Sequence, residues 1–238
     1  MNEKHIVGAF DCDLENIHTA VMKMGGFVEE ALSNAATALE TRDMALAKKV
    51  RGGDRVIDAL DQSIKSDTAR LLALRAPTAR DLRTVLSVIE ISSHLERCGD
   101  YAKNISKRTV TMARDGEIAK ALPALRRMSG FVENMIKDAL DAYATQDDAK
   151  AEEIIERDQE ADEIYNTLFR FLLTHMMEDH RNITAGMHLH FIAKNIERVG
   201  DHATGIAEQT IYLVTGKFPD EERPKRDHTS FKIQKSDA

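Results

Sequence analysis

The pentapeptide ERCGD at residues 96–100 recurs as ERVGD at residues 197–201, and this repetition decides the fold of the chain. The similarity extends further, because MGGFVE at residues 24–29 matches MSGFVE at residues 128–133. The offset between matching residues is 104 in the first part of each copy and 101 from Arg80 onward, so the second copy lacks three residues. A constant offset with a single gap indicates a duplicated unit.

Each copy is predicted to form three long helices, because apolar residues recur at spacings of three and four. The second apolar stripe stops at Ala76-Pro77, since the residue before a proline disfavours the helical region. Pro123 suits the first turn of the fourth helix. The predicted helices cover residues 14–39, 46–74, 79–114, 123–140, 148–177 and 182–215.

Amphipathic helices of about 30 residues pack as bundles at shallow crossing angles. The predicted fold class is therefore all-α, with six long helices in two tandem, duplicated three-helix bundles related by a pseudo-twofold axis. The first bundle covers residues 1–115 and the second residues 116–216, and they join at the turn Arg114-Asp115-Gly116. Residues 217–238 contain two prolines among mixed charges and are predicted to be a disordered tail.

Composition and charge exclude several classes of protein. The net charge is −7, whereas nucleic-acid binding needs clustered positive charge. The sequence has no run of about 18 apolar residues that would span a membrane. Because a secretory signal and a disulfide framework are both absent, the chain is predicted to be cytoplasmic. Cys98 aligns with Val199 and is predicted to be a small buried side chain.

Each copy carries two pairs of acidic residues four positions apart, one on its second helix and one on its third. That spacing directs both carboxylates of a pair to one face of a helix, where they repel each other. Asp58 and Glu96 are equally distant from the turn at Pro77, so antiparallel packing brings two pairs to one patch. The eight residues are Asp54, Asp58, Glu96 and Asp100 in the first copy, and Asp158, Asp162, Glu197 and Asp201 in the second.

Clustered carboxylates without thiols are typical ligands of hard or borderline cations, namely iron, manganese, magnesium, calcium or zinc. The sequence therefore predicts one metal site in each copy. Gly99 and Gly200 lie beside these ligands, and a glycine inside a helix costs about 1 kcal/mol relative to alanine. We therefore expect a close backbone approach at both glycines. His202 follows Asp201 and is a candidate outer-shell partner of a metal ligand.

Acidic pairs on long charged helices also form ordinary solvated faces, and four neighbouring arginines could neutralise them. Those arginines are Arg55, Arg97, Arg157 and Arg198. Four pairs at matched positions of a duplicated unit favour the metal interpretation. The sequence shows no nucleophile motif, phosphate-binding glycine loop or dinucleotide fingerprint, so we do not expect an enzyme.

The stretches LERCGDYAKNI at residues 95–105 and IERVGDHA at residues 196–203 resemble the PhoU family of phosphate-signalling regulators. The resemblance covers nearly the whole chain except the tail. One departure is Gly205, because the first copy has Asn104 at the matching position. A shared ligand role for Asn104 is therefore not expected.

The resemblance implies a negative regulator of phosphate uptake and phosphate-starvation signalling. Such a protein restrains a high-affinity phosphate ABC transporter and keeps a phosphate-sensor histidine kinase inactive when phosphate is plentiful. It is expected to be a cytoplasmic homodimer that meets the membrane only through its partners. The resemblance also implies multinuclear clusters of iron or zinc at the acidic motifs, with magnesium or manganese as further candidates. A carboxylate-bridged metalloenzyme and a metal-independent helical adapter are the alternatives.

Overall fold

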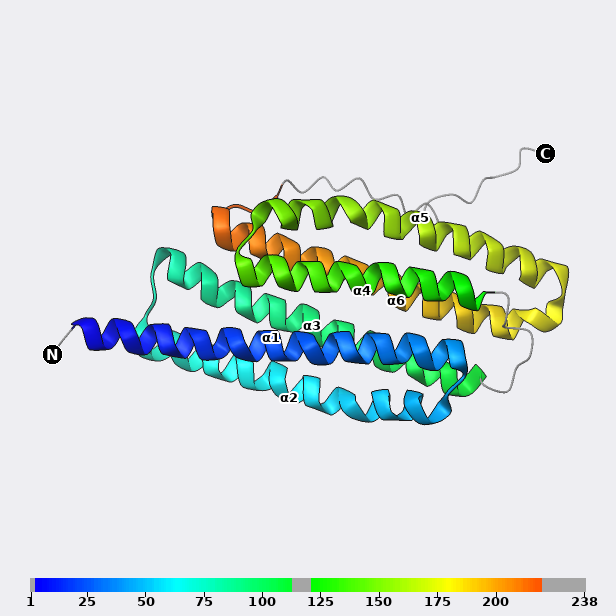
Figure 1. Ribbon diagram of the computed structural model, residues 1–238, viewed down its shortest axis with the longest axis horizontal. Coiled ribbons are helices and arrows are strands. Elements are labelled where there is room, and N and C mark those ends of the chain that lie inside the picture. Colours follow the sequence, from blue (N-terminus) through cyan, green and yellow to red (C-terminus); the bar gives the residue numbers. More distant parts are fainter. Residues whose placement is uncertain (1–2, 113–120, 220–238) are drawn as a thin grey trace.

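The computed structural model describes residues 3–112 and 121–219 and confirms the all-α fold (Figure 1). The described part contains no β-strand, and the predicted helix bounds agree closely except at two places, because the first helix begins earlier, at Glu3, and the fourth ends later, at Thr145. The predicted joint at Arg114-Asp115-Gly116 and the tail beyond Pro219 lie outside the described residues. The helices are α1 (Glu3–Thr41), α2 (Met44–Arg75), α3 (Ala79–Met112), α4 (Leu122–Thr145), α5 (Asp148–Glu178) and α6 (Ile183–Thr215), with the short 3-10 helix η2 (His180–Asn182).

The same turn chemistry joins the first two helices of each copy. Asp43 caps α2 by accepting hydrogen bonds from two backbone N–H groups, and Asp147 caps α5 through the N–H of Lys150. The preceding residues Arg42 and Gln146 both have left-handed backbone angles. An aspartate cap is worth about 1 kcal/mol to a helix. The left-handed residue and the cap that follows it therefore form the same tight turn in both copies.

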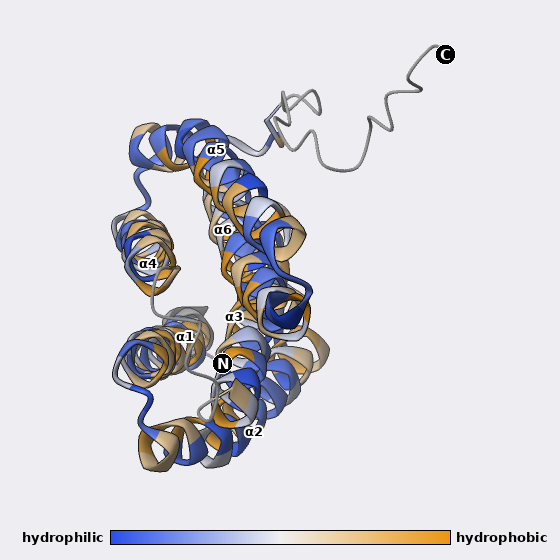
Figure 2. Ribbon diagram, turned by 90° about the vertical axis from the view of Figure 1, so that its right-hand side faces the viewer, coloured by the Kyte–Doolittle hydropathy of each residue, from blue (hydrophilic) through white to orange (hydrophobic). Residues whose placement is uncertain are grey.

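The helices form two layers, which Figure 2 shows from one end. One layer contains α2, α3, α6 and α5 in that order, and α1 and α4 pack against it. Within each copy every helix contacts the other two, and the copies meet through α3 against α6 and α1 against α4. This matching set of contacts agrees with the predicted pseudo-twofold arrangement, while the domain boundary at residue 115 stays a prediction.

A single apolar core runs through both copies. Met24 and Leu95 are fully buried in the first copy, and Met128 and Ile192 in the second. Cys98 is also fully buried, as predicted from its match with Val199, and burial raises the pKa of its thiol. Among the described residues, no helix combines the length and the apolar character that a membrane span requires.

Removal of the residues after Asp220 is expected to leave the melting temperature unchanged. The last helix already ends at Thr215, and Phe218 stacks on Tyr212 with ring centroids 4.2 Å apart. A chain ending at Asp220 keeps that contact, whereas a control chain ending at Gly216 loses it and should melt at a lower temperature. Thermal unfolding followed by circular dichroism checks both. A fall of several degrees in the longer variant would contradict the expectation.

Candidate functional site

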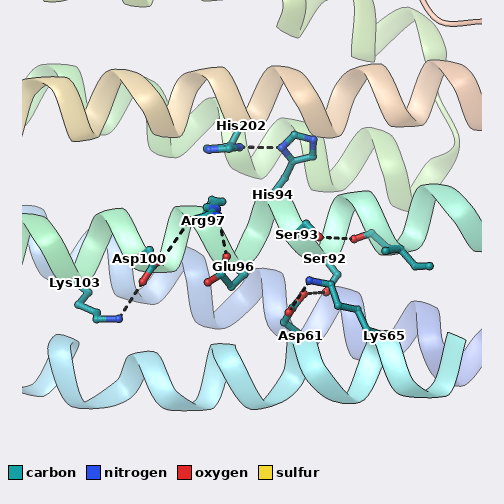
Figure 3. A network of polar contacts seen from close by, with 11 residues as sticks. Asp61, Lys65, Ser92, Ser93, His94, Glu96, Arg97, Asp100, Lys103 and His202 are labelled. Carbon is teal, nitrogen blue, oxygen red and sulfur yellow. Dashed lines mark hydrogen bonds and ion pairs between the residues drawn. The ribbon is translucent and has the colours of Figure 1, made fainter. Parts of the chain in front are cut away.

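In the first copy the acidic pairs on α2 and α3 come together around a lysine. The Nζ atom of Lys103 lies 2.5 Å from Oδ2 of Asp54 and 3.0 Å from Oδ1 of Asp100. Figure 3 shows Lys103 reaching Asp100 along the edge of α3. Asp54, on α2, is only 5% exposed, and its ion-pair partner Lys103 lies on α3. The ammonium group therefore joins one carboxylate from each helix.

The pKa values of the other two predicted residues of this patch are raised by burial and by neighbouring carboxylates. Burial raises the pKa of Asp58, and the carboxylates of Asp54 and Asp100 raise it further. Burial likewise raises the pKa of Glu96, and Asp100, Asp61 and Asp58 add to the effect. Desolvation is the larger cause in both cases and charge repulsion the smaller. The four carboxylates therefore form one electrostatically coupled patch, as the spacing predicts.

The structure adds a fifth carboxylate, Asp61, that sequence reasoning missed. Asp61 is buried at 7% exposure, accepts a hydrogen bond from Oγ of Ser92 at 2.7 Å, and pairs with Lys65 at 2.8 Å (Figure 3). It follows Asp58 by three positions, so the helical spacing was a usable signal. The second copy has Tyr165 at the matching position, which is why the repeat did not reveal it.

The second copy brings its own pairs together on α5 and α6. Asp162 and Glu197 are both 6% exposed, and Nζ of Lys194 lies 2.8 Å from Oε1 of Glu197. Burial raises the pKa of Glu197 to about 7, with smaller contributions from the carboxylates of Asp201 and Asp162, while Lys194 opposes the rise. Asp162, Glu197 and Asp201 therefore lie close enough to influence one another, and Oδ1 of Asp158 lies beside Gly200 on α6.

The two glycines beside the patches differ. A Cβ atom on Gly99 would lie 3.0 Å from Cδ1 of Ile57, so α2 and α3 approach closely there. A Cβ atom on Gly200 would lie 3.7 Å from Oδ1 of Asp158, which is ordinary van der Waals contact. The expected close approach is confirmed at Gly99, and it is wrong at Gly200.

Lysines, rather than the arginines considered from the sequence, make the tight contacts with the patches. Arg97 lies at the longer distances of 3.7 Å from Glu96 and 3.9 Å from Asp100. Arg157 pairs with Asp138 at 2.6 Å. Lys103 and Lys194 could not be singled out from the sequence, because exposed and inward-facing lysines follow the same pattern in a charged helix.

His202 pairs with another histidine. Its Nδ1 atom lies 2.9 Å from Nδ1 of His94, across the contact between α6 and α3 (Figure 3). The pKa of His202 is lowered to about 4, mainly by burial and to a smaller extent by His94 and nearby arginines. A Cβ atom on Gly205 would come within 2.3 Å of Cε1 of His94, so this glycine makes room for the ring. The outer-shell role expected for His202 stays untested.

Two buried oxygen atoms test whether the patches suit a metal ion. Oδ1 of Asp54 and Oε2 of Glu197 have no hydrogen-bond partner among the described residues. A buried carboxylate oxygen without a partner is costly, and coordination to a hard cation satisfies such an atom. The donor set, all oxygen and mostly carboxylate, fits such a cation. As the described side chains stand, no three His, Cys, Asp or Glu are grouped closely enough to hold one. Metal binding therefore requires these side chains to rotate, and the eight ligands stay a prediction.

Replacement of Glu197 by Gln is expected to stabilise the metal-free protein by about 1 kcal/mol at pH 8 and to have little effect at pH 5. The pKa of Glu197 is 4.5 ordinarily and about 7 in the folded chain, so the folded state binds more protons between these values. The free energy of unfolding therefore falls as the pH rises from about 5 to 7. Weaker pairing with Lys194 offsets part of the gain.

Urea unfolding of both proteins at the two pH values, in the presence of a chelator, measures this effect. Equal stability differences at pH 5 and pH 8 would show that Glu197 does not titrate in this range.

Comparisons with known proteins agree with the geometry of the fold. The family model named PhoU domain matches residues 21–109 and 125–210, one match in each copy. A protein of Rhizobium meliloti named phosphate-specific transport system accessory protein PhoU homolog is 44% identical over 97% of both chains. A protein of the same name from Caulobacter vibrioides is 42% identical over 94% of this chain and 97% of its own.

Two solved structures have the same fold. The crystal structure of PhoU from Pseudomonas aeruginosa superposes with a TM-score of 0.85 at 36% identity, covering 87% of this chain and all of that one. The phosphate transport system regulatory protein PhoU from Streptococcus pneumoniae gives a TM-score of 0.82 at 30% identity, covering 89% of this chain and 99% of that one. Six helices in this arrangement are therefore a known architecture.

Proposed function

The chain belongs to the PhoU family, and on that premise we propose that it lowers phosphate uptake and phosphate-starvation signalling when phosphate is plentiful. It acts as an accessory protein of a phosphate-specific transport system. Its partners are the phosphate ABC transporter and the phosphate-sensor histidine kinase, between which it serves as a metal-binding adapter. It works in the cytoplasm as a homodimer, reaches the membrane through these partners, and performs no catalysis.

The observation that carries the regulatory part is the match of both copies to one family whose relatives have transport-accessory names. The relative from Streptococcus pneumoniae is named as a regulatory protein. An adapter also needs a rigid surface rather than a reactive pocket. The two-layer bundle with one continuous core supplies such a surface.

The observation that supports metal binding is the pair of buried, unsatisfied carboxylate oxygens, one in each patch. Asp54, Asp58, Glu96 and Asp100 hold the cation in the first copy, and Asp158, Asp162, Glu197 and Asp201 hold it in the second. A bound cation supplies positive charge to carboxylates that the lysine of each patch neutralises only in part. In each copy the ligands come from both the second and the third helix, so they clamp this helix pair and fix the outer surface for a partner.

Deletion of the gene is expected to raise phosphate uptake and the expression of phosphate-starvation genes in phosphate-rich medium. Uptake of radiolabelled phosphate and a reporter fusion measure these effects, and the wild-type chain should restore repression. Normal uptake and normal repression in the deletion strain would contradict the proposed function.

Complementation with a chain carrying alanine in place of four ligands tests the metal-binding part. The variant replaces Glu96, Asp100, Glu197 and Asp201. Failure to restore repression, with wild-type protein levels, supports the metal-dependent adapter. Full restoration would favour a metal-independent helical adapter, because the surface would then act without its carboxylates.

A further inference from the structure

Each copy holds a lysine ammonium group inside its carboxylate patch, and we propose that Lys103 and Lys194 are built-in competitors of the bound cation. Each lysine must leave its patch before a metal ion can enter, so it sets the metal affinity of that patch. The inference rests on the proposed metal binding and goes beyond it, because it assigns a regulatory role to two residues that are not ligands.

Lys103 occupies the position that a bridging cation needs. Its ammonium contacts Asp54 on α2 and Asp100 on α3, at 2.5 and 3.0 Å, so it already joins the two helices. A divalent cation that joins the same carboxylates would lie beside the ammonium group. Two positive charges within a few ångströms in a partly buried patch repel strongly. The metal ion and the lysine therefore exclude each other.

The lysine side chains can leave without unfolding the protein. The side chain of Lys103 is 40% exposed and that of Lys194 is 31% exposed, whereas their partners Asp54 and Glu197 are buried. A lysine has a flexible four-carbon stem, so it can place its charged group in water while the stem stays on the surface. The carboxylates stay in the patch and become available to the metal ion.

The duplication shows that the two lysines do not descend from one ancestral position. Lys103 matches Thr204 in the second copy, and Lys194 matches Ser93 in the first. Lys103 follows an acidic ligand by three positions, while Lys194 precedes one by three positions. Each copy has thus placed one ammonium group in its patch from a different side. Because both copies place a lysine in the patch from different positions, each patch requires a positive charge when it holds no metal ion.

The lysines satisfy the buried carboxylates only in part. Lys103 pairs with Oδ2 of Asp54 and leaves Oδ1 without a partner, and Lys194 pairs with Oε1 of Glu197 and leaves Oε2 without one. A divalent cation carries twice the charge of an ammonium group and can be coordinated by both oxygens of a carboxylate. The cation therefore gains interactions that the lysine does not make. This difference lets metal displace lysine once its concentration is high enough.

Replacement of Lys103 by Met tests the competition. The background chain carries alanine at Glu197 and Asp201, so only the first patch binds metal. The matched control is Lys107→Met, which removes the same charge from an exposed position one turn further along α3. Binding of Mn²⁺ is measured by isothermal titration calorimetry. We expect Lys103→Met to bind Mn²⁺ about tenfold tighter or more than its background, and Lys107→Met to bind with almost unchanged affinity.

Thermal unfolding gives a second readout that does not depend on calorimetry. Without metal, Lys103→Met should melt at a lower temperature than its background, because buried Asp54 loses its charge partner. Saturating Mn²⁺ should raise the melting temperature of Lys103→Met by more than it raises that of the background. A purely structural ion pair predicts the first fall without the larger gain on metal addition.

The outcomes separate the inference from the proposed function. If the background chain binds Mn²⁺ at the first patch and Lys103→Met binds with equal or weaker affinity, the competition is wrong while metal binding stands. If neither chain binds Mn²⁺, both the metal-binding proposal and the competition are wrong. The reciprocal experiment with Lys194→Met, in a chain with alanine at Glu96 and Asp100, should give the same gain at the second patch.

Discussion

Alanine in place of both Glu96 and Asp100 is expected to remove the metal from the first patch and leave the second patch loaded. Both side chains belong to the coupled group around Asp54 and Asp58, and two ligands from α2 alone cannot enclose a cation. The reciprocal variant, with alanine at Glu197 and Asp201, should lose only the second site. Each double variant should therefore retain one of the two loaded sites of the wild-type chain.

Elemental analysis of protein purified without chelator or affinity-tag metal measures this result. The matched control carries alanine at Glu152 and Glu156, an exposed acidic pair four residues apart on α5. It changes the net charge by the same amount and should keep the wild-type metal content. Equal metal content in all four proteins would contradict the two metal sites and indicate that the patches are ordinary ion-paired surfaces.

Metal loading should also depend on pH in a different way at the two patches. Ligands must lose their protons before they bind a cation. The pKa of Glu197 is about 7, so the second patch should fill only as the pH approaches and passes neutrality. Metal content of the two double variants, measured between pH 5 and pH 8, separates the two patches.

The helices were predictable because strong local signals coincide with the periodic pattern. Pro77 and the aspartate caps at Asp43 and Asp147 end or begin helices at the points where the apolar stripes break. These signals act over a few residues and need no knowledge of the packing. The layer order of α2, α3, α6 and α5 depends on contacts between the two copies, and no local pattern encodes it.

The carboxylates of the candidate site were predictable because they recur at matching positions in both copies of the duplicated unit. The residues that the prediction missed are those in which the two copies differ. Asp61 matches Tyr165, Lys103 matches Thr204, and neither pair is visible as a repeat. The copies have therefore kept their acidic framework and diverged in the groups that surround it. Differences in metal affinity between the two patches are the expected consequence.

The copies also differ where α3 meets α6. The ring of His94 occupies the space above Gly205, while the matching residues in the other direction are Asn195 and Asn104. The histidine pair therefore lies on only one side of the pseudo-twofold axis. Sequence reasoning noted Gly205 as a departure and could not identify the ring, because the contact joins residues far apart in the chain.

Alanine in place of Gly205 is expected to destabilise the protein by about 1–3 kcal/mol, although alanine is the better helix former. The added Cβ atom would come within 2.3 Å of Cε1 of His94, so the ring must shift, which disturbs its contact with His202. Gly130→Ala is the matched control, because nothing lies within 4 Å of a Cβ atom there. That change should stabilise the helix by about 1 kcal/mol.

A double-mutant cycle with His94→Ala assigns the cost of Gly205→Ala to the ring. Urea unfolding of the wild-type chain, the two single variants and the double variant gives the coupling free energy. Because His94→Ala removes the atoms that collide with the new methyl group, Gly205→Ala should cost little in that background. A gain in stability from Gly205→Ala alone, like that expected for Gly130→Ala, would show that the ring moves aside freely. The contact between α3 and α6 would then owe its specificity to the surrounding apolar residues rather than to the histidine pair.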